Sequence, residues 1–434
     1  MIRDLRQPLP DAHFLNSELA ARWMAEGRLV PFERESSLRV TGRRFSFVTQ
    51  PAEWTDAQLF DAARLTLALQ AEAVEAGYDL KDASAWNVLF DGCSPVFCDL
   101  LSFELLVDRP WWAYGQFARQ FLLPLLASRR VGLKSRESFC IWRDGMPPES
   151  ARRLLGWPAL LSRYGALLAR PRAPAFSSVD VVKPRGAEPV EALQNFRRRL
   201  HATAQWQLEG VRPVVGTVSG SAASAGQGWS DYEGDRPHYG GASLDRKRAV
   251  IDGWMERLSP AWVLDLGCNT GEFSRMALAR GFRVIALDSD HDSVQRLYLA
   301  QVGEARLYPL VAPLDDLRSS RGWGGQEHPG LDQRLEGSAD LVLMLALIHH
   351  LAIGASVPMD EVARFAYRCS RDALVLEVLQ EDDPQLVTLC RQRRRDPSEF
   401  SAARQRAAFF EAGFKLAAEE QLDGAARSLL LWTK

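Results

Sequence analysis

The stretch Val263-Leu264-Asp265-Leu266-Gly267-Cys268-Asn269-Thr270-Gly271 joins an apolar run to a turn that contains glycine. The apolar run predicts a buried strand over residues 262–266, and the pattern after the turn predicts a helix over residues 272–280. Further apolar runs, alternating with helical patterns, follow at residues 283–287, 307–311, 340–344 and 373–378. This alternation predicts a mostly parallel sheet flanked by helices, in which ligands bind at the carboxyl ends of the strands.

The turn does not follow the pattern of a dinucleotide-binding loop. Such a loop uses G-x-G-x-x-G, but Asn269 stands two residues after Gly267, where the second glycine would be. We therefore expect no pyrophosphate at this turn. The next predicted strand leads into Asp288, whose carboxylate can accept hydrogen bonds from both hydroxyls of a ribose. Asp265 can accept a hydrogen bond from an ammonium group, directly or through water.

These motifs resemble those of the class I S-adenosylmethionine-dependent methyltransferases. In that family the first strand carries D/E-x-G-x-G-x-G or a close variant, and the second strand ends in an acid. The resemblance implies a Rossmann-like α/β domain with a mostly parallel seven-stranded sheet, and S-adenosyl-L-methionine as the cofactor. It implies cofactor contacts from Asp265, Gly267, Cys268, Asn269, Gly271, Asp288 and Ser289. The alternative is an ordinary strand–turn–helix unit whose glycines serve only the turn.

Two further cofactor contacts are expected outside this pair of motifs. The third strand should end in a residue that reads the adenine amino group, and Asp315 is the candidate, although it arrives late because Pro313 occupies the nearer position. Asp315 can equally begin a polar loop. Upstream, Tyr239 can close over the cofactor by cation–π attraction, or it can anchor the linker.

Candidate catalytic residues follow the fourth and fifth strands. His349 and His350 come after the fourth strand, where the acceptor lies in this fold, and either can serve as a base or orient the acceptor. Because two adjacent side chains cannot both point the same way from a regular element, we expect only one of them to face the methyl group. Glu377, at the end of the fifth strand, is a second candidate base. Its alternative is a solvated acid at a strand end.

Composition shifts divide the chain into three segments. We predict an α+β substrate-selecting or accessory domain over residues 1–205, a linker rich in Gly, Ser and Pro over residues 206–240, and the S-adenosylmethionine-binding domain over residues 241–434. Within the first segment, periodicity predicts helices over residues 56–76, 111–130 and 149–170. Residues 87–90 and 95–98 predict a β-hairpin around Gly92.

The N-terminal segment carries a second pattern. Asp82, Asn87 five positions later, and Asp99 after the predicted hairpin are similar to the catalytic and metal loops of protein kinases. The kinase pattern is incomplete, since no Gly-rich loop or clear strand lysine precedes it and Leu100-Leu101 follows Asp99. The same string also resembles a bacterial group of methyltransferase-like proteins related to a nodulation protein, and that resemblance spans nearly the whole chain.

Composition bounds the remaining possibilities. The 434 residues carry a formal net charge of -2, which gives no general reason to expect a nucleic acid or an anionic membrane as partner. The six cysteines show no metal-binding spacing, so we expect no metal site. No secretory signal and no membrane-spanning run is evident, so we expect a cytoplasmic protein without a membrane partner. Oligomeric state has no signature in the sequence.

The favoured hypothesis is therefore an S-adenosylmethionine-dependent methyltransferase acting on oxygen or nitrogen of an acceptor, which is a small molecule or a protein. Two alternatives stay open at this stage. One is a non-catalytic protein that keeps the fold as a scaffold. The other is a bifunctional protein whose N-terminal half also transfers phosphoryl groups.

Overall fold

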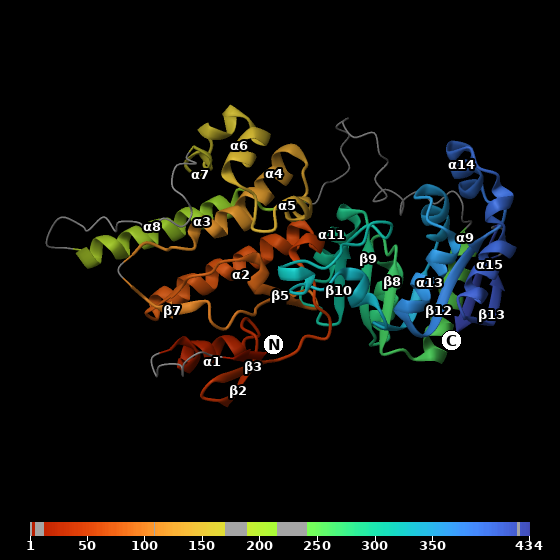
Figure 1. Cartoon of the computed structure of the whole chain (residues 1–434), viewed down its shortest axis with the longest axis horizontal. Helices are drawn as coiled ribbons and strands as arrows, with labels where there is room; N and C mark the ends of the chain where they lie inside the picture. Colours follow the sequence, from red (N-terminus) through yellow and green to blue (C-terminus); the bar gives the residue numbers. More distant parts are fainter. Residues whose placement is uncertain (1, 5–12, 108, 170–188, 215–240, 423–425) are drawn as a thin grey trace. The chain divides into compact units, whose positions relative to one another are not determined.

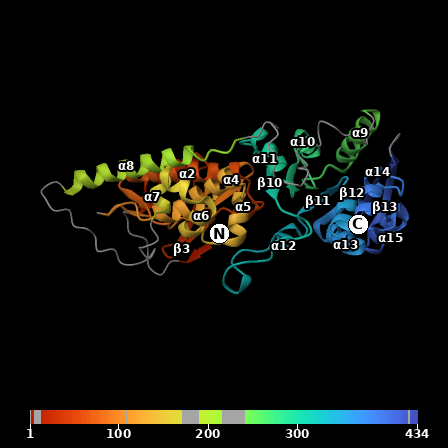
Figure 2. The same cartoon turned by 90° about the horizontal axis from the view of Figure 1, so that it is seen from above.

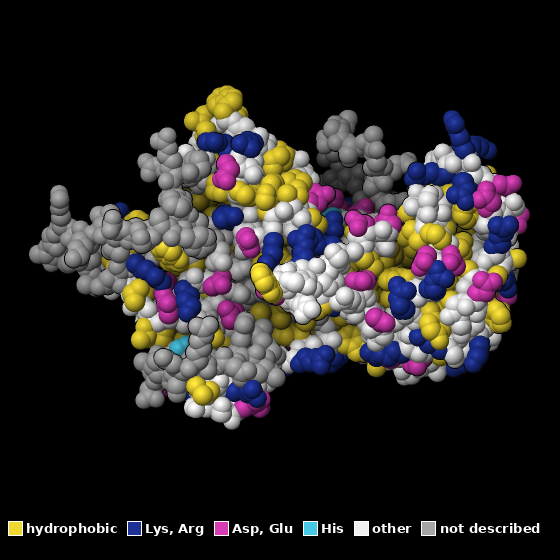
Figure 3. All heavy atoms as spheres, viewed as in Figure 1, with side chains coloured by type: hydrophobic (Ala, Val, Ile, Leu, Met, Phe, Trp, Pro, Cys, Tyr) yellow, Lys and Arg dark blue, Asp and Glu magenta, His cyan; other side chains and the backbone are white. Residues whose placement is uncertain are grey.

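A computed structural model describes residues 2–4, 13–107, 109–169, 189–214, 241–422 and 426–434 (Figure 1). The chain divides into two compact units, Met1–Thr217 and Val218–Lys434. Acidic and basic side chains are interspersed on the viewed face of the C-terminal unit (Figure 3), in keeping with the small net charge. None of the helices in the described ranges is long and apolar enough to cross a membrane.

The C-terminal unit is a Rossmann-like α/β domain built on a seven-stranded sheet of order β10-β9-β8-β11-β12-β14-β13. The first five strands in this order are parallel to their neighbours, and β14 runs antiparallel to both β12 and β13. The strands are β8 (Trp262–Leu266), β9 (Arg283–Asp288), β10 (Leu307–Val311), β11 (Ala339–Met344), β12 (Ser370–Leu379), β13 (Lys415–Gln421) and β14 (Arg427–Thr433). All five strands expected from apolar runs are present.

Helices cover both faces of this sheet, which explains why its central strands are largely apolar. Figure 2 shows α9, α10 and α11 over one face, and α12, α13 and α15 over the other. The helices are α9 (Gly241–Leu258), α10 (Glu272–Ala279), α11 (His291–Ala300), α12 (Leu331–Leu335), α13 (Met359–Cys369), α14 (Pro384–Arg393) and α15 (Ala402–Glu411). A π-helical turn, His350–Gly354, precedes α13.

The N-terminal unit combines helices with small antiparallel sheets. Its strands are β1 (Ile2–Asp4), β2 (Phe32–Ser36), β3 (Arg39–Gly42), β4 (Tyr78–Leu80), β5 (Val88–Asp91), β6 (Ser94–Phe97) and β7 (Phe103–Leu105). Its helices are α1 (Glu18–Ala25), α2 (Asp56–Glu75), α3 (Tyr114–Phe117), α4 (Leu123–Val131), α5 (Ser135–Ile141), α6 (Pro148–Leu155), α7 (Gly165–Leu168) and α8 (Pro189–Glu209). A buried cluster of Phe14, Trp23, Phe97 and Phe103 rings forms part of the core.

The helix predicted over residues 56–76 is confirmed as α2, but the other two helix predictions of this unit were too simple. The segment 111–130 starts at Tyr114 and contains a π-helical turn, Ala118–Leu122, before α4. One helix over 149–170 is wrong, because α6 ends at Leu155. Gly156 follows with φ = 72° and ψ = 179°, a conformation that essentially only glycine adopts, and a separate 3₁₀ turn, Trp157–Leu161, begins after it.

The predicted hairpin is confirmed as β5 and β6, with Gly92 at φ = 65° in its turn. Beside it, the Asn87 side-chain amide donates to the Asp82 carbonyl oxygen at 3.1 Å and to Ser102 Oγ at 3.3 Å. The Ser102 hydroxyl in turn donates to Asp99 at 2.6 Å. In the described part of the chain, no group of three or more His, Cys, Asp or Glu side chains is arranged to hold a metal ion. The likeness to kinases stays a prediction.

The domain limits also stay a prediction. Helix α8 continues to Glu209, so its last turn overlaps the start of the linker predicted at residue 206. Residues 215–240, most of that linker, lie outside the described ranges.

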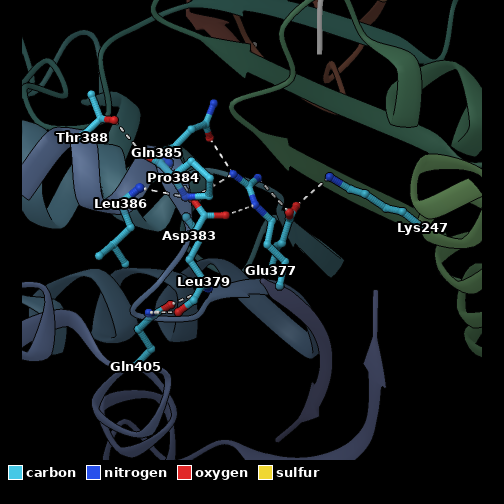
Figure 4. A network of polar contacts seen from close by, with 10 residues as sticks. Lys247, Glu377, Leu379, Asp383, Pro384, Gln385, Leu386, Thr388 and Gln405 are labelled. Carbon is cyan, nitrogen blue, oxygen red and sulfur yellow. Dashed lines mark hydrogen bonds and ion pairs between the residues drawn. The ribbon is translucent and has the colours of Figure 1, made fainter. Parts of the chain in front are cut away.

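A chain of buried ion pairs crosses the C-terminal unit (Figure 4). Arg427 on β14 lies 3.2 Å from Glu377 on β12 and 2.7 Å from Asp383, the residue that caps α14, and the side chains of Arg427 and Glu377 are completely buried. The second Glu377 oxygen lies 2.6 Å from Nζ of Lys247 on α9. Charges of opposite sign therefore alternate along the chain Asp383–Arg427–Glu377–Lys247. This arrangement satisfies the requirement that buried charges be paired.

We predict that Arg427→Met lowers the free energy of unfolding of the C-terminal unit by about 3–5 kcal/mol, because two acids then stay buried with one cation fewer. The loss should grow as pH rises, since the acids can escape the penalty only by taking up protons. Amide hydrogen exchange of β12 and β14 in increasing urea measures this effect. Arg404→Met, an exposed arginine on α15, is the matched control. Equal protection in the two variants would contradict the prediction.

Candidate functional site

A cavity of about 380 Å³ opens at the carboxyl ends of β8, β9, β10 and β11. This volume lies within the range of roughly 300–1,000 Å³ typical of small-molecule sites. Eight residues that were singled out in the sequence line it together: Asp265, Gly267, Cys268, Asn269, Asp288, Ser289, Asp315 and His350. The strand ends therefore bring three predicted acids, the glycine-containing turn and one histidine into one pocket.

The turn after β8 takes up a conformation that few residues tolerate. Gly267, Asn269 and Gly271 have φ values of 75°, 50° and 82°, all in the left-handed region. Asn is among the non-glycine residues that tolerate this region best, which explains why Asn269 can stand where related loops carry glycine. Gly271 does not line the cavity, but a Cβ there would lie 2.5 Å from Leu297 Cδ1. Its role is to let the turn pack against α11.

Asp288, at the end of β9, fixes the position of this turn. One carboxylate oxygen accepts a hydrogen bond from the Asn269 backbone N–H at 2.8 Å, and the other accepts one from the Asp290 N–H at the same distance. Burial raises the pKa of Asp288. The backbone N–H of Ser289 also donates to this carboxylate, which still lines the cavity and can accept a hydrogen bond from a ligand hydroxyl.

Asp265 lies deeper, with 2% of its surface exposed, and accepts a hydrogen bond from the Ser274 hydroxyl at 2.6 Å. Burial, together with the charge of Asp288 and against the opposing effects of Ser274 and Lys247, raises the pKa of Asp265 to about 6. A ligand cation near Asp265 would relieve this cost, because opposite charge favours the ionised acid. The geometry thus fits an ammonium group.

Lys247 is a residue of the site that the sequence did not reveal. It comes from α9 and lines the cavity with only 4% of its surface exposed. Its ammonium group pairs with Glu377 and lies 5.2 Å from the centre of the Phe273 ring. The sequence around a lysine in an amphipathic helix does not show that the side chain will line a cavity. Lys247 reaches the cavity only because α9 packs on the sheet.

The two histidines differ in their surroundings, as expected from their adjacency. His350 lines the cavity, whereas His349 is 98% buried beside it, with the two ring centres 4.0 Å apart. Burial, and then the positive charge of Arg427, lower the pKa of His350 to about 4. His350 is therefore neutral at neutral pH and can both donate and accept a hydrogen bond.

Glu377 does not line the cavity. Its carboxylate is fully buried in the ion-pair chain with Lys247 and Arg427. The alternative of a solvated acid at a strand end is therefore wrong for Glu377, and its role as a catalytic base stays a prediction.

The remaining predicted contacts have different outcomes. Asp315 lines the cavity next to Leu314, so the late position of this acid still brings it to the site. Leu345, Leu347 and Leu351 add an apolar wall after β11. Tyr239 lies outside the described residues. The cavity lining thus combines acids with apolar side chains.

Comparison with solved structures gives matches that each cover less than half of this chain. Magnesium protoporphyrin IX methyltransferase from Synechocystis PCC 6803, crystallised with S-adenosylmethionine, is 15% identical, with 44% of this chain and 80% of that chain covered and a TM-score of 0.31. The PH0226 protein from Pyrococcus horikoshii OT3 is 15% identical, covering 46% and 97%, with a TM-score of 0.34. At these values neither bears on substrate.

No known family model matches the chain. A curated relative does: the nodulation protein NoeA of Rhizobium meliloti (strain 1021) is 30% identical over 392 residues, which cover 85% of this chain and 79% of the relative. Since the match extends well beyond one domain, the chain belongs to the family of the nodulation protein NoeA.

Proposed function

We propose that the C-terminal unit is an S-adenosylmethionine-dependent methyltransferase whose cofactor lies in the cavity at the ends of β8–β11. The observation that carries this proposal is the pairing of Asp265 and Asp288 around one left-handed turn. When bound, S-adenosylmethionine supplies a methyl group that is activated by the positive sulfonium.

Different residues of the cavity contact different parts of the cofactor. Asp265 accepts hydrogen bonds from the methionine ammonium, and Asp288 accepts them from the ribose hydroxyls. Asp315 and Leu314 hold the adenine end, with Ser289 beside Asp288. The turn with Gly267, Cys268 and Asn269 brings backbone close to the ligand.

His350 orients the acceptor rather than removing its proton. A group with a pKa of about 4 is a weak base at neutral pH, whereas alignment of the acceptor with the methyl group carries much of the rate. His349 supports the His350 ring from behind, and Glu377 holds Lys247 in the pocket wall. The acceptor presents an oxygen or nitrogen, and the N-terminal unit selects it.

Removal of the Asp288 carboxylate should weaken cofactor binding by more than about tenfold, because two hydrogen bonds to a charged acceptor are lost. Calorimetry of Asp288→Ala with S-adenosylhomocysteine measures this change, and circular dichroism checks the fold. Asp316→Ala, an exposed acid outside the cavity, is the matched control and should bind as the unaltered protein does. Equal affinity in all three proteins would sink the proposed site.

Asp265→Asn should abolish cofactor binding and yet stabilise the empty protein. The raised pKa means that the folded state holds the proton more tightly than the unfolded state, so the stability contributed by Asp265 falls as pH rises from about 4 to about 6. The Asp265→Asn variant lacks this pH-dependent loss. Its free energy of unfolding should therefore exceed that of the unaltered protein by roughly 2–3 kcal/mol at pH 7.5, and the two should be equal near pH 4.

Urea denaturation of the variant and of the unaltered protein at pH 4 and pH 7.5 measures this difference in stability. A variant that is less stable than the unaltered protein at pH 7.5 would show that the Asp265 charge is compensated without a ligand.

Catalysis is tested separately from binding. Transfer of a labelled methyl group from S-adenosylmethionine to a component of a bacterial extract, lost in Asp288→Ala and kept in Asp316→Ala, distinguishes an enzyme from a scaffold.

A further inference from the structure

The N-terminal unit contains a cavity of its own, of about 410 Å³, between α2, α8 and the segment that follows β7. Helices α2 and α8, which both contribute residues to this cavity, pack against each other (Figure 2). Its lining differs in charge from that of the C-terminal cavity. Three basic side chains line it, Arg197, Arg198 and His201, against one acid, Glu75.

Arg197 is the central group of this cavity. It is 92% buried, and its guanidinium donates hydrogen bonds to the backbone carbonyls of Val107 and Arg109, the latter at 2.8 and 3.1 Å. These bonds use Nε and Nη2. Within the residues that the structure describes, Nη1 makes no hydrogen bond and Arg197 forms no ion pair. A buried cation that meets only neutral acceptors carries a desolvation cost that an anion would offset.

The nearby acid Asp79 does not supply that anion. It is 99% buried on β4, where one of its oxygens accepts a hydrogen bond from Gln70 at 2.8 Å. Among the described residues the other oxygen has no hydrogen-bond partner, and burial raises the pKa of Asp79 although Arg109 and Arg197 oppose the shift. Asp79 therefore acts on Arg197 only from beyond ion-pair distance.

The rest of the cavity offers a rim with basic groups and an apolar wall. Arg198 is exposed at the rim, and His201, one turn after Arg197, contacts the Leu67 carbonyl at 3.1 Å. The wall includes Leu106, Val74 and the buried Trp111, whose indole is fixed by a hydrogen bond to the Leu80 carbonyl at 2.9 Å. A rigid aromatic surface next to two guanidinium groups suits a ligand with an apolar body and one anionic group.

We propose that this cavity binds a small organic anion, with a carboxylate or phosphate at Arg197 and Arg198 and an apolar body against Trp111 and Leu106. The site is independent of the methyl transfer proposed for the other unit. It gives the N-terminal unit a ligand of its own.

Calorimetry of the full chain tests this site with four probes. Phenyl phosphate and phenylacetate carry both the anion and the ring, inorganic phosphate carries only the anion, and benzyl alcohol only the ring. At least one of the two aromatic anions should bind saturably. Inorganic phosphate and benzyl alcohol should bind at least about tenfold more weakly than that anion. Whichever of the two aromatic anions binds more tightly shows whether the site prefers a phosphate or a carboxylate. Absence of saturable binding by both, or equal binding of benzyl alcohol, would overturn the proposal.

Variants assign the binding to this cavity. Arg197→Gln and Arg198→Gln should each weaken the aromatic anion at least about tenfold, while Arg199→Gln, exposed on the same helix and outside the cavity, should leave it unchanged. Because Arg197 also holds the backbone of residues 107 and 109, the exposed Arg198 provides the test that does not depend on folding. Equal affinity in the Arg198 and Arg199 variants would place the ligand elsewhere and refute the site.

Discussion

The packing of the C-terminal unit depends on the buried guanidinium group of Arg427, a residue that belongs to no recognisable sequence motif. Arg427 lies fully buried between Glu377 and Asp383, and it also donates to the Gln385 side chain at 2.7 Å. It thereby joins the antiparallel pair β12 and β14 to the start of α14. Helix α14 packs against the π-helical turn that carries His350, and Glu377 passes the ion-pair chain on to Lys247. The two sides of the cavity are thus held by one set of buried charges.

The same region keeps several groups in unfavourable states. The turn after β8 holds Asn269 in the left-handed region, and Ala346 in the pocket wall has φ = 51°, which is unusual for a residue with a Cβ. Asp265 and Asp288 both have raised pKa values. Strain and buried charge of this kind cluster where a ligand completes the interactions. A cavity built only for stability would replace these groups with apolar ones.

The sequence could predict what is encoded locally. The strands β8 to β12 were found because both faces of each are buried, and the turn at Gly267 because its glycines and Asp288 fall one strand–helix–strand unit apart. The break of the helix at Gly156 was missed because helical periodicity continues on both sides of it. Lys247, and Arg427 as the centre of the ion-pair chain, were missed for a different reason. Their roles depend on partners 130 and 50 residues away, at Glu377, and a single sequence carries no sign of such pairs.

Each of the two cavities holds buried charge, which is negative in the C-terminal cavity and positive at Arg197 in the N-terminal cavity. In the C-terminal cavity, desolvated carboxylates favour a ligand that brings positive charge, and the ammonium of S-adenosylmethionine would supply it. In the N-terminal cavity, a desolvated guanidinium favours a ligand that brings negative charge. In each case neutral hydrogen-bond partners offset only part of the cost of burying the charge in the absence of a ligand. Since that cost is recovered only on binding, the sign of the buried charge is the feature of each cavity that most restricts the chemistry of what fills it.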